Sequence, residues 1–134
     1  MVQIDVCSEE SIQAAAAYLR SKDVTLYALV NNAGVGGSNP SVMTTNFYGP
    51  KRVTDAMVDL VDKKEGRVVN VSSGAASSWV KKQDEKTRRF FSDPNLTWEA
   101  LEEAIKAIVA AGQGGYGLSK AGLTALTMVQ VSSC

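Results

Sequence analysis

The sequence has 134 residues, 45% of them hydrophobic and 21% charged, which is the composition of one globular domain with a core of its own. Lysine and arginine number 14, as do aspartate and glutamate, so the zero net charge provides no basic field for nucleic acid or an anionic membrane. The two cysteines do not make a disulfide framework or a metal site. The absence of histidine excludes a histidine-based catalytic triad and a histidine-ligated metal. The apolar runs are too short for a membrane span and no apolar signal segment is present, so we expect a cytoplasmic location.

The first part of the chain predicts a strand, a helix and a second strand. Residues 2–6 alternate apolar and polar side chains as a short strand does. Ser8 is placed to cap a helix that follows. The core-facing stripe of that helix is Ile12, Ala15, Ala16 and Leu19. Residues 24–30 predict the second strand, which ends in the polar segment 31–34.

The second part of the chain continues the alternation. Residues 43–63 predict a long helix and residues 67–73 a third strand. Residues 77–95 are polar and charged, and Thr97 caps a further helix. One face of that helix carries Trp98, Leu101, Ile105 and Ile108. Residues 117–131 predict the last helix.

This order of elements indicates an α/β fold with a parallel sheet and right-handed crossovers, in one domain without internal repeats. Ligands bind beyond the carboxyl ends of the strands in such sheets. We therefore expect three groups of polar or chain-end residues to converge there. They are Asp5 with Val6, Asn31 to Gly34, and Ser72 with Ser73.

The segment from Tyr116 to Lys120 adds a chemical function. If Tyr116 begins a helix, Lys120 lies on the same face one turn later. A nearby ammonium group favours the ionised phenol and lowers its pKa, so the tyrosine can serve as a general acid or base. A single Y-x-x-x-K pair occurs often by chance at the surface, but here a strand-end serine and an N-N-A-G segment accompany it.

Four segments together resemble the short-chain dehydrogenase/reductase family. They are N-N-A-G at 31–34, T-N-F-Y-G at 45–49, R-V-V-N-V-S-S at 67–73 and Y-G-L-S-K at 116–120. The resemblance implies a partial Rossmann-type doubly wound parallel sheet, with residues 1–134 as a single partial NAD(P)-binding domain. Residues 77–111 resemble the insertion of the monomeric carbonyl reductases and their plant menthone and salutaridine reductase relatives. Within it, residues 93–111 resemble the added segment that covers a dimerisation face in those reductases. This resemblance implies that the intact protein, of which the chain is expected to be a part, is monomeric.

The resemblance also implies catalytic roles. Tyr116 would protonate the carbonyl oxygen of a small-molecule substrate during reduction. Lys120 would lower the pKa of that tyrosine and hold the nicotinamide ribose. Ser73 would hydrogen-bond the substrate oxygen, with Ser72 as the neighbouring candidate. The implied activity is NADPH-dependent reduction of a ketone, aldehyde or quinone to an alcohol.

The implied cofactor is NADP(H), with NAD(H) second. Asn32, Ala33 and Gly34 would lie along it, and Asp5 with Val6 would meet its adenine. NADP(H) is preferred on the subfamily resemblance alone. The hydride comes from the nicotinamide, so the protein supplies positioning and protons.

Asn46 is the fourth implied member of the site, and Pro50 gives a physical reason for its role. In an α-helix the carbonyl of Asn46 would accept from the N–H of residue 50, which proline lacks. We therefore expect the helix to kink and the Asn46 carbonyl to stay free for a water that feeds protons through Lys120. A proline simply tolerated in the helix is the alternative.

The sequence departs from the family pattern at both ends. It lacks the initial strand with its glycine-rich turn, and the strands that follow the last helix, which predicts an internal fragment of a reductase. Such a fragment could instead be a noncatalytic remnant that binds a partner, or itself, through exposed sheet edges. A third possibility is an isomerase or dehydratase of the extended branch, against which the strand context of Ser73 and the insertion argue.

Overall fold

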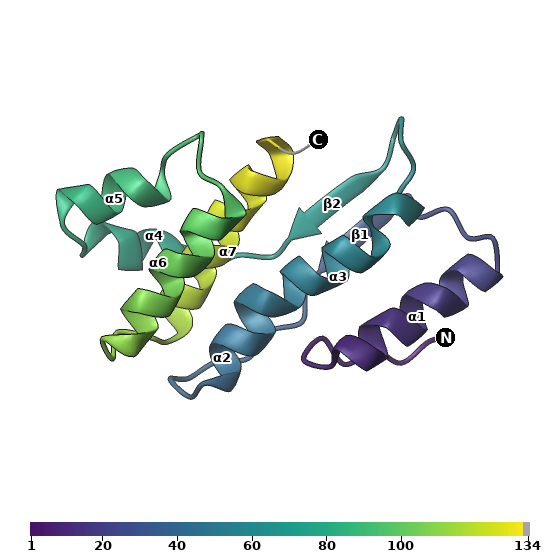
Figure 1. Cartoon of the computed structure of the whole chain (residues 1–134), viewed down its shortest axis with the longest axis horizontal. Coiled ribbons are helices and arrows are strands. Elements are labelled where there is room, and N and C mark those ends of the chain that lie inside the picture. The colour runs from purple at the N-terminus through teal and green to yellow at the C-terminus, as the bar shows by residue number, and fades with distance from the viewer. Residues whose placement is uncertain (133–134) are drawn as a thin grey trace.

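The computed structural model describes residues 1–132 (Figure 1). The α-helices are α1 (Glu9–Ser21), α2 (Ser41–Met43), α3 (Gly49–Met57), α4 (Gly74–Lys81), α5 (Glu85–Phe91), α6 (Trp98–Ala110) and α7 (Tyr116–Ser132). A π-helical turn, η1 (Thr44–Tyr48), joins α2 to α3, and a 3-10 turn, η2 (Val58–Leu60), follows α3. The strands are β1 (Ala28–Asn31) and β2 (Arg67–Asn70).

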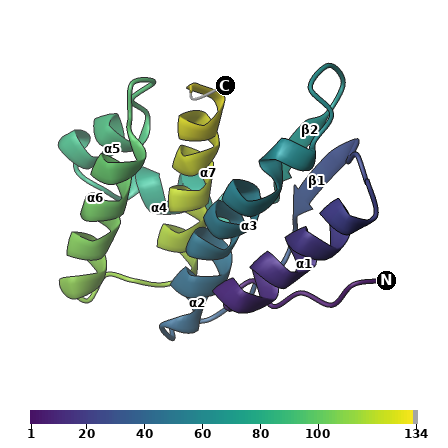
Figure 2. The same ribbon diagram turned by 45° about the vertical axis from the view of Figure 1, so that its right-hand side comes forward.

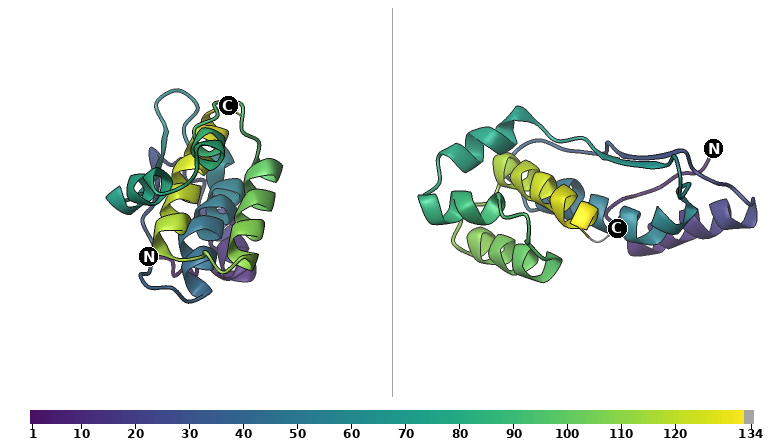
Figure 3. Two further views of the ribbon diagram at one scale, coloured as in Figure 1. Left: turned by 90° about the vertical axis from the view of Figure 1, so that its left-hand side faces the viewer. Right: turned by 90° about the horizontal axis from the view of Figure 1, so that it is seen from above.

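The two strands pair in parallel, which confirms the predicted α/β class with a parallel sheet. Their register runs from Ala28 opposite Arg67 to Asn31 opposite Asn70. Seen from above, α3 and α7 lie on one side of the strands (Figure 3, right). Leu29 and Asn31 face these helices and are buried, whereas Val30 on the opposite face is 54% exposed. Among the described residues no helix covers that second face.

The predicted strand over residues 2–6 is wrong. This segment pairs with neither strand of the sheet, and only Val2 and Val6 pack, partly buried, against the cluster of α1, β1 and α3. A strand needs a neighbouring backbone to satisfy its N–H and C=O groups. Alternation of side chains predicts the extended shape of residues 2–6 but cannot supply that neighbour.

The long helix predicted over residues 43–63 is divided. The N–H of Gly49 donates to the carbonyl of Thr44, five residues back, which makes a wide π-turn of the kind often found at functional sites. Pro50 then falls in the first turn of α3, where a missing N–H costs little. The expected kink within one α-helix is therefore replaced by a π-helical turn that ends just before Pro50.

Two apolar clusters form the core. The first joins α1, β1 and α3 through Ile12, Leu29 and Val53, so the predicted stripe of α1 is confirmed. The second surrounds α7, with Leu101 and Ile105 of α6 fully or almost fully buried against it. Both predicted caps are present. Ser8 Oγ accepts from Ser11 N at 3.2 Å, and Thr97 Oγ1 accepts from Ala100 N at 3.3 Å.

The polar segment after β2 contains two helices, α4 and α5, for which the sequence analysis gave no prediction. Figure 2 shows them with α6 on the side of α7 away from α1. The helix α6 is anchored by Trp98, whose ring stacks on that of Phe47 at 5.5 Å between centroids. The insertion over 77–111 therefore packs on η1 and α7, and the role of residues 93–111 as a cover for a dimerisation face stays a prediction.

Candidate active site

The ammonium group of Lys120 is the centre of the candidate site. The residue is only 5% exposed, and its Nζ donates to the carbonyl oxygen of Val71 at 2.7 Å. The same nitrogen lies 5.8 Å from the ring centroid of Tyr116, which begins α7 as predicted. The end of β2 and the first turn of α7 therefore meet at one charged group.

The loop after β1 reaches this point through Gly34. A β-carbon at Gly34 would lie 3.3 Å from Asn46 Oδ1 and 3.6 Å from Lys120 Nζ. Contacts as short as the first leave little room for a side chain. The predicted residues Gly34, Asn46 and Lys120 are thus brought together, from three separate elements.

The side-chain amide of Asn46 is fully buried and fully used. Its Oδ1 accepts from Val35 N at 2.8 Å, and its Nδ2 donates to Val35 O at 2.8 Å. Nδ2 also donates to Ser119 Oγ at 3.1 Å, and that hydroxyl donates to Tyr116 O at 2.7 Å. A continuous chain of hydrogen bonds therefore connects the loop after β1, the turn η1 and the start of α7.

The start of α7 depends on a glycine whose backbone conformation disfavours other residues. Gly115 has a φ of +133°, in the region that L side chains rarely adopt, and it immediately precedes Tyr116. Gly115 therefore marks the point where the inserted segment ends and α7 begins.

The two candidate serines have different surroundings. Ser73 caps α4, and its Oγ accepts from Ala75 N at 3.2 Å, so the hydroxyl keeps its own proton for donation. Ser72 Oγ lies 2.7 Å from Thr124 Oγ1 and 3.3 Å from Lys120 O, against α7. The partners of Ser72 on α7 favour Ser73 as the serine that is free to face a substrate.

Asn31 has a structural role. Its Nδ2 donates to Thr54 Oγ1 at 3.0 Å and to Asn70 Oδ1 at 2.8 Å, and Asn70 is its partner in the sheet register. The buried polar end of β1 is therefore satisfied by α3 and β2. The three residues that follow it in the N-N-A-G segment are exposed.

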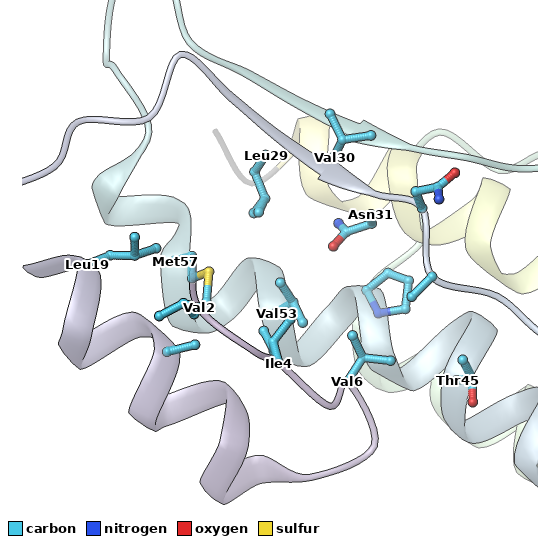
Figure 4. Close-up of a pocket in the computed structure, with 14 residues that line it drawn as sticks. Val2, Ile4, Val6, Leu19, Leu29, Val30, Asn31, Thr45, Val53 and Met57 are labelled. Carbon is cyan, nitrogen blue, oxygen red and sulfur yellow. The ribbon is translucent and has the colours of Figure 1, made fainter.

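An apolar cavity of about 260 Å³ lies between the N-terminal segment and β1 (Figure 4). Val6, Asn32 and Ala33 line it, together with Thr45. Asp5 lies outside this lining, and its carboxylate accepts from Cys7 N at 2.9 Å. The predicted cofactor residues therefore divide between this cavity and the surroundings of Lys120.

Sequence reasoning missed three groups of the site: the Val71 carbonyl, the Val35 backbone and the Ser119 hydroxyl. Backbone groups leave no signal in residue types. Ser119 does have a signal in the sequence, because it precedes Lys120 and falls one helical turn after Tyr116.

The comparison with known proteins decides the family. A profile of the family described as short chain dehydrogenase matches residues 1–83, more than half of the chain. The chain belongs to the short-chain dehydrogenase family.

Curated relatives of this family member include carbonyl reductase [NADPH] 1 from Bos taurus, 30% identical over 148 residues that cover 95% of the chain and 53% of the relative. The same-named protein of Mus musculus is 32% identical over equal shares. The chain thus spans about half the length of these relatives.

Solved structures support the fold. Menthone neomenthol reductase from Mentha piperita matches with a TM-score of 0.80 at 24% identity, over 98% of this chain and 65% of that one. Salutaridine reductase from Papaver somniferum matches with a TM-score of 0.81 at 22% identity, over 98% and 63%. The likeness confirms that the chain has part of the α/β fold of these two reductases. No helix within residues 1–132 has the length and apolar character needed to cross a membrane.

Proposed function

We propose that this chain is the catalytic part of an NADP(H)-dependent reductase that converts the carbonyl group of a ketone, aldehyde or quinone to an alcohol. One observation carries the proposal. Lys120 on α7 lies beside the ring of Tyr116 and beside Gly34, which packs on Asn46, at the carboxyl side of the two parallel strands, where α/β sheets bind ligands. The printed names of the curated relatives support the carbonyl substrate and NADPH.

In the proposed reaction the phenol of Tyr116 donates its proton to the substrate oxygen. The buried ammonium of Lys120, one turn along α7, stabilises the resulting phenolate. The Ser73 hydroxyl, which keeps its proton while it caps α4, donates a hydrogen bond to the same oxygen. The cofactor, when bound, supplies the hydride to the carbonyl carbon.

The residues around the two predicted cofactor regions fit a dinucleotide. The apolar cavity lined by Val6, Asn32 and Ala33 suits the flat face of an adenine. The lack of a side chain at Gly34 lets its backbone pack close to Asn46 and to the ammonium group of Lys120 that would hold a ribose. Asp5 does not line the apolar cavity, so in this proposal it lies near the adenine only because it precedes Val6 in the chain.

Asn46 has a further proposed role in proton supply. Pro50 has no N–H to give the Asn46 carbonyl in an α-helical register, and the π-turn η1 contains this residue. A water on the Asn46 carbonyl would then return a proton to Tyr116 through Lys120. The side chain of Asn46 is already occupied, so the backbone oxygen is the group that this role requires.

A second candidate function is a noncatalytic binding protein. The observation that favours it is the uncovered face of the sheet, where Val30 is 54% and Val69 43% exposed. Each strand also pairs on one edge only in the described part of the chain. Such surfaces bind other chains readily. In the reductase proposal the intact protein is monomeric and cytoplasmic.

A titration with NADPH followed by nicotinamide fluorescence separates the two functions. Binding, followed by consumption of NADPH with a quinone or ketone, supports the reductase. Tyr116→Phe should then abolish turnover and leave NADPH binding unchanged, because the phenyl ring keeps its shape and loses only its proton. Tyr27→Phe, at a tyrosine that is 66% exposed, is the matched control. An active Tyr116→Phe variant contradicts the proton-donor role, and a chain that never binds NADPH favours the binding protein.

A further inference from the structure

The hydroxyl group of Ser119 is enclosed completely between two elements of the candidate site. The residue is 0% exposed, and its Oγ both donates to Tyr116 O and accepts from Asn46 Nδ2. A helical serine can satisfy its hydroxyl within its own helix by the first of these bonds alone. The bond from Asn46 Nδ2 is therefore not needed to satisfy the hydroxyl, and it connects α7 to η1.

This tie extends beyond the two helical elements. The same Asn46 amide holds both backbone groups of Val35, in the loop that follows β1. On the next residue of α7, Lys120 is tied to the end of β2 through the carbonyl of Val71. Adjacent residues of α7 thus fix its first turns to two different neighbours.

We propose that Ser119 is a positioning residue, which holds the first turn of α7 against Asn46 and so sets where Tyr116 and Lys120 stand relative to the loop after β1. The inference rests on the function proposed above, since only there do these two side chains act on a substrate. Without the hydroxyl, the buried N–H of Asn46 has lost its partner, and the amide must rotate or move away from Val35 to find another.

The same helix provides a closely matched control. Thr127 Oγ1 donates to Leu123 O at 2.9 Å and accepts from Asn70 Nδ2 at 2.9 Å. It therefore repeats the bonding of Ser119, with an asparagine from another element and a carbonyl of its own helix, at a distance from Tyr116. Ser119→Ala and Thr127→Val each remove one such hydroxyl.

The first readout is hydrogen exchange of the Val35 amide, which Asn46 Oδ1 protects and which needs no catalytic activity. Loss of a buried hydrogen bond of ordinary strength predicts about tenfold faster exchange in Ser119→Ala. Thr127→Val should leave this rate within about twofold of the unchanged protein, because its partner lies in β2. Equal rates in both variants overturn the proposal.

The second readout is the reaction, with the two variants compared at conditions where they are equally folded. Ser119→Ala should lower kcat for carbonyl reduction by about tenfold with KM for NADPH little changed, and Thr127→Val should not. An equal fall in both variants shows a structural role only and overturns the proposal. If the unchanged protein binds no NADPH and reduces nothing, the proposed function fails and the catalytic part of this inference fails with it. The exchange rate at Val35 then still decides whether Ser119 holds the loop.

A variant that does not fold leaves a measurement on the unchanged protein. Both protons of the Asn46 side-chain amide should be protected from exchange, since the residue is fully buried and each proton is in a separate hydrogen bond. Rapid exchange of either proton contradicts the tie.

Discussion

Gly122 and Phe47 approach each other so closely that a β-carbon on the glycine would lie 2.9 Å from Phe47 Cδ2. This contact is the place where α7 crosses η1, two residues after Lys120 and one residue after Asn46. The missing side chain lets the two backbones come near enough for the Asn46–Ser119 hydrogen bond to form.

Gly122→Ala should therefore destabilise the fold. The added methyl group also meets Ile105 Cδ1 at 3.1 Å, so the core has to shift, at a cost of about 1–3 kcal/mol. Denaturant unfolding measures this loss. Gly36→Ala is the control, because a β-carbon there meets nothing within 4 Å. Equal midpoints for the two variants would show that the helices can separate without cost.

Asn46→Ala should lower the free energy of unfolding by about 2–3 kcal/mol, since it removes three hydrogen bonds and leaves the buried hydroxyl of Ser119 without this donor. The side chain is 0% exposed and bonds both backbone groups of Val35 and the hydroxyl of Ser119. Asn95→Ala, at an exposed asparagine in a loop, should change it little. Thermal and denaturant unfolding give both values. A neutral Asn46→Ala would mean that water replaces all three bonds.

Asp62 should contribute stability that depends on pH. Backbone N–H groups of Glu65 and Lys64 donate to its Oδ1 at 2.8 Å each, and these bonds hold the pKa of the carboxyl group below its usual range. Because the folded-state pKa is lowered, the contribution is complete above the ordinary value of about 3.9. It is lost as the pH falls through the folded-state pKa.

Asp62→Asn removes the charge and tests the direction in which the stabilising contribution of Asp62 changes with pH. The stability difference between the unchanged protein and the variant should be constant at neutral pH and shrink on acidification. Unfolding curves at a series of acidic pH values measure it. A difference that grows on acidification contradicts the assignment.

Trp98→Ala should loosen α6 from η1. The indole stacks on Phe47, and Lys51 Nζ lies 4.8 Å from its centroid, so the variant loses about 2 kcal/mol of packing at a half-buried site. If α6 covers an association face, as the family resemblance implies, sedimentation should show more dimer in this variant. Lys106→Ala, on the exposed side of α6, is the control. An unchanged monomer fraction would speak against the covering role.

The parts of the fold that local sequence determines could be predicted. Ser8 and Thr97 cap helices as expected, because a cap needs only a side-chain oxygen and an N–H three residues later. The same local logic was available for α4 and α5. Their caps are Ser73 and Asp84, but the segment is polar and has no long apolar stripe that would point to a helix after each cap.

The parts that depend on distant partners could not be predicted. Residues 2–6 have the alternation of a strand, but alternation does not specify what lies beside them. The spacing of Tyr116 and Lys120 follows from a helix, yet nothing in it points to the Val71 carbonyl that holds the ammonium. The place of Ser119 on the helix is visible in the sequence, but its partner Asn46 is 73 positions away in the chain, so the bond between them is not.

These separations bear on the order in which the chain acquires structure. The cluster of α1, β1 and α3 uses residues no later than Val68 and can assemble early in synthesis. The bonds of the candidate site join Asn46 to Ser119 and Val71 to Lys120, so they close only when α7 has been made. A chain that ended before α7 would keep the residues of the first apolar cluster but would lack Tyr116, Ser119 and Lys120, and therefore the candidate site.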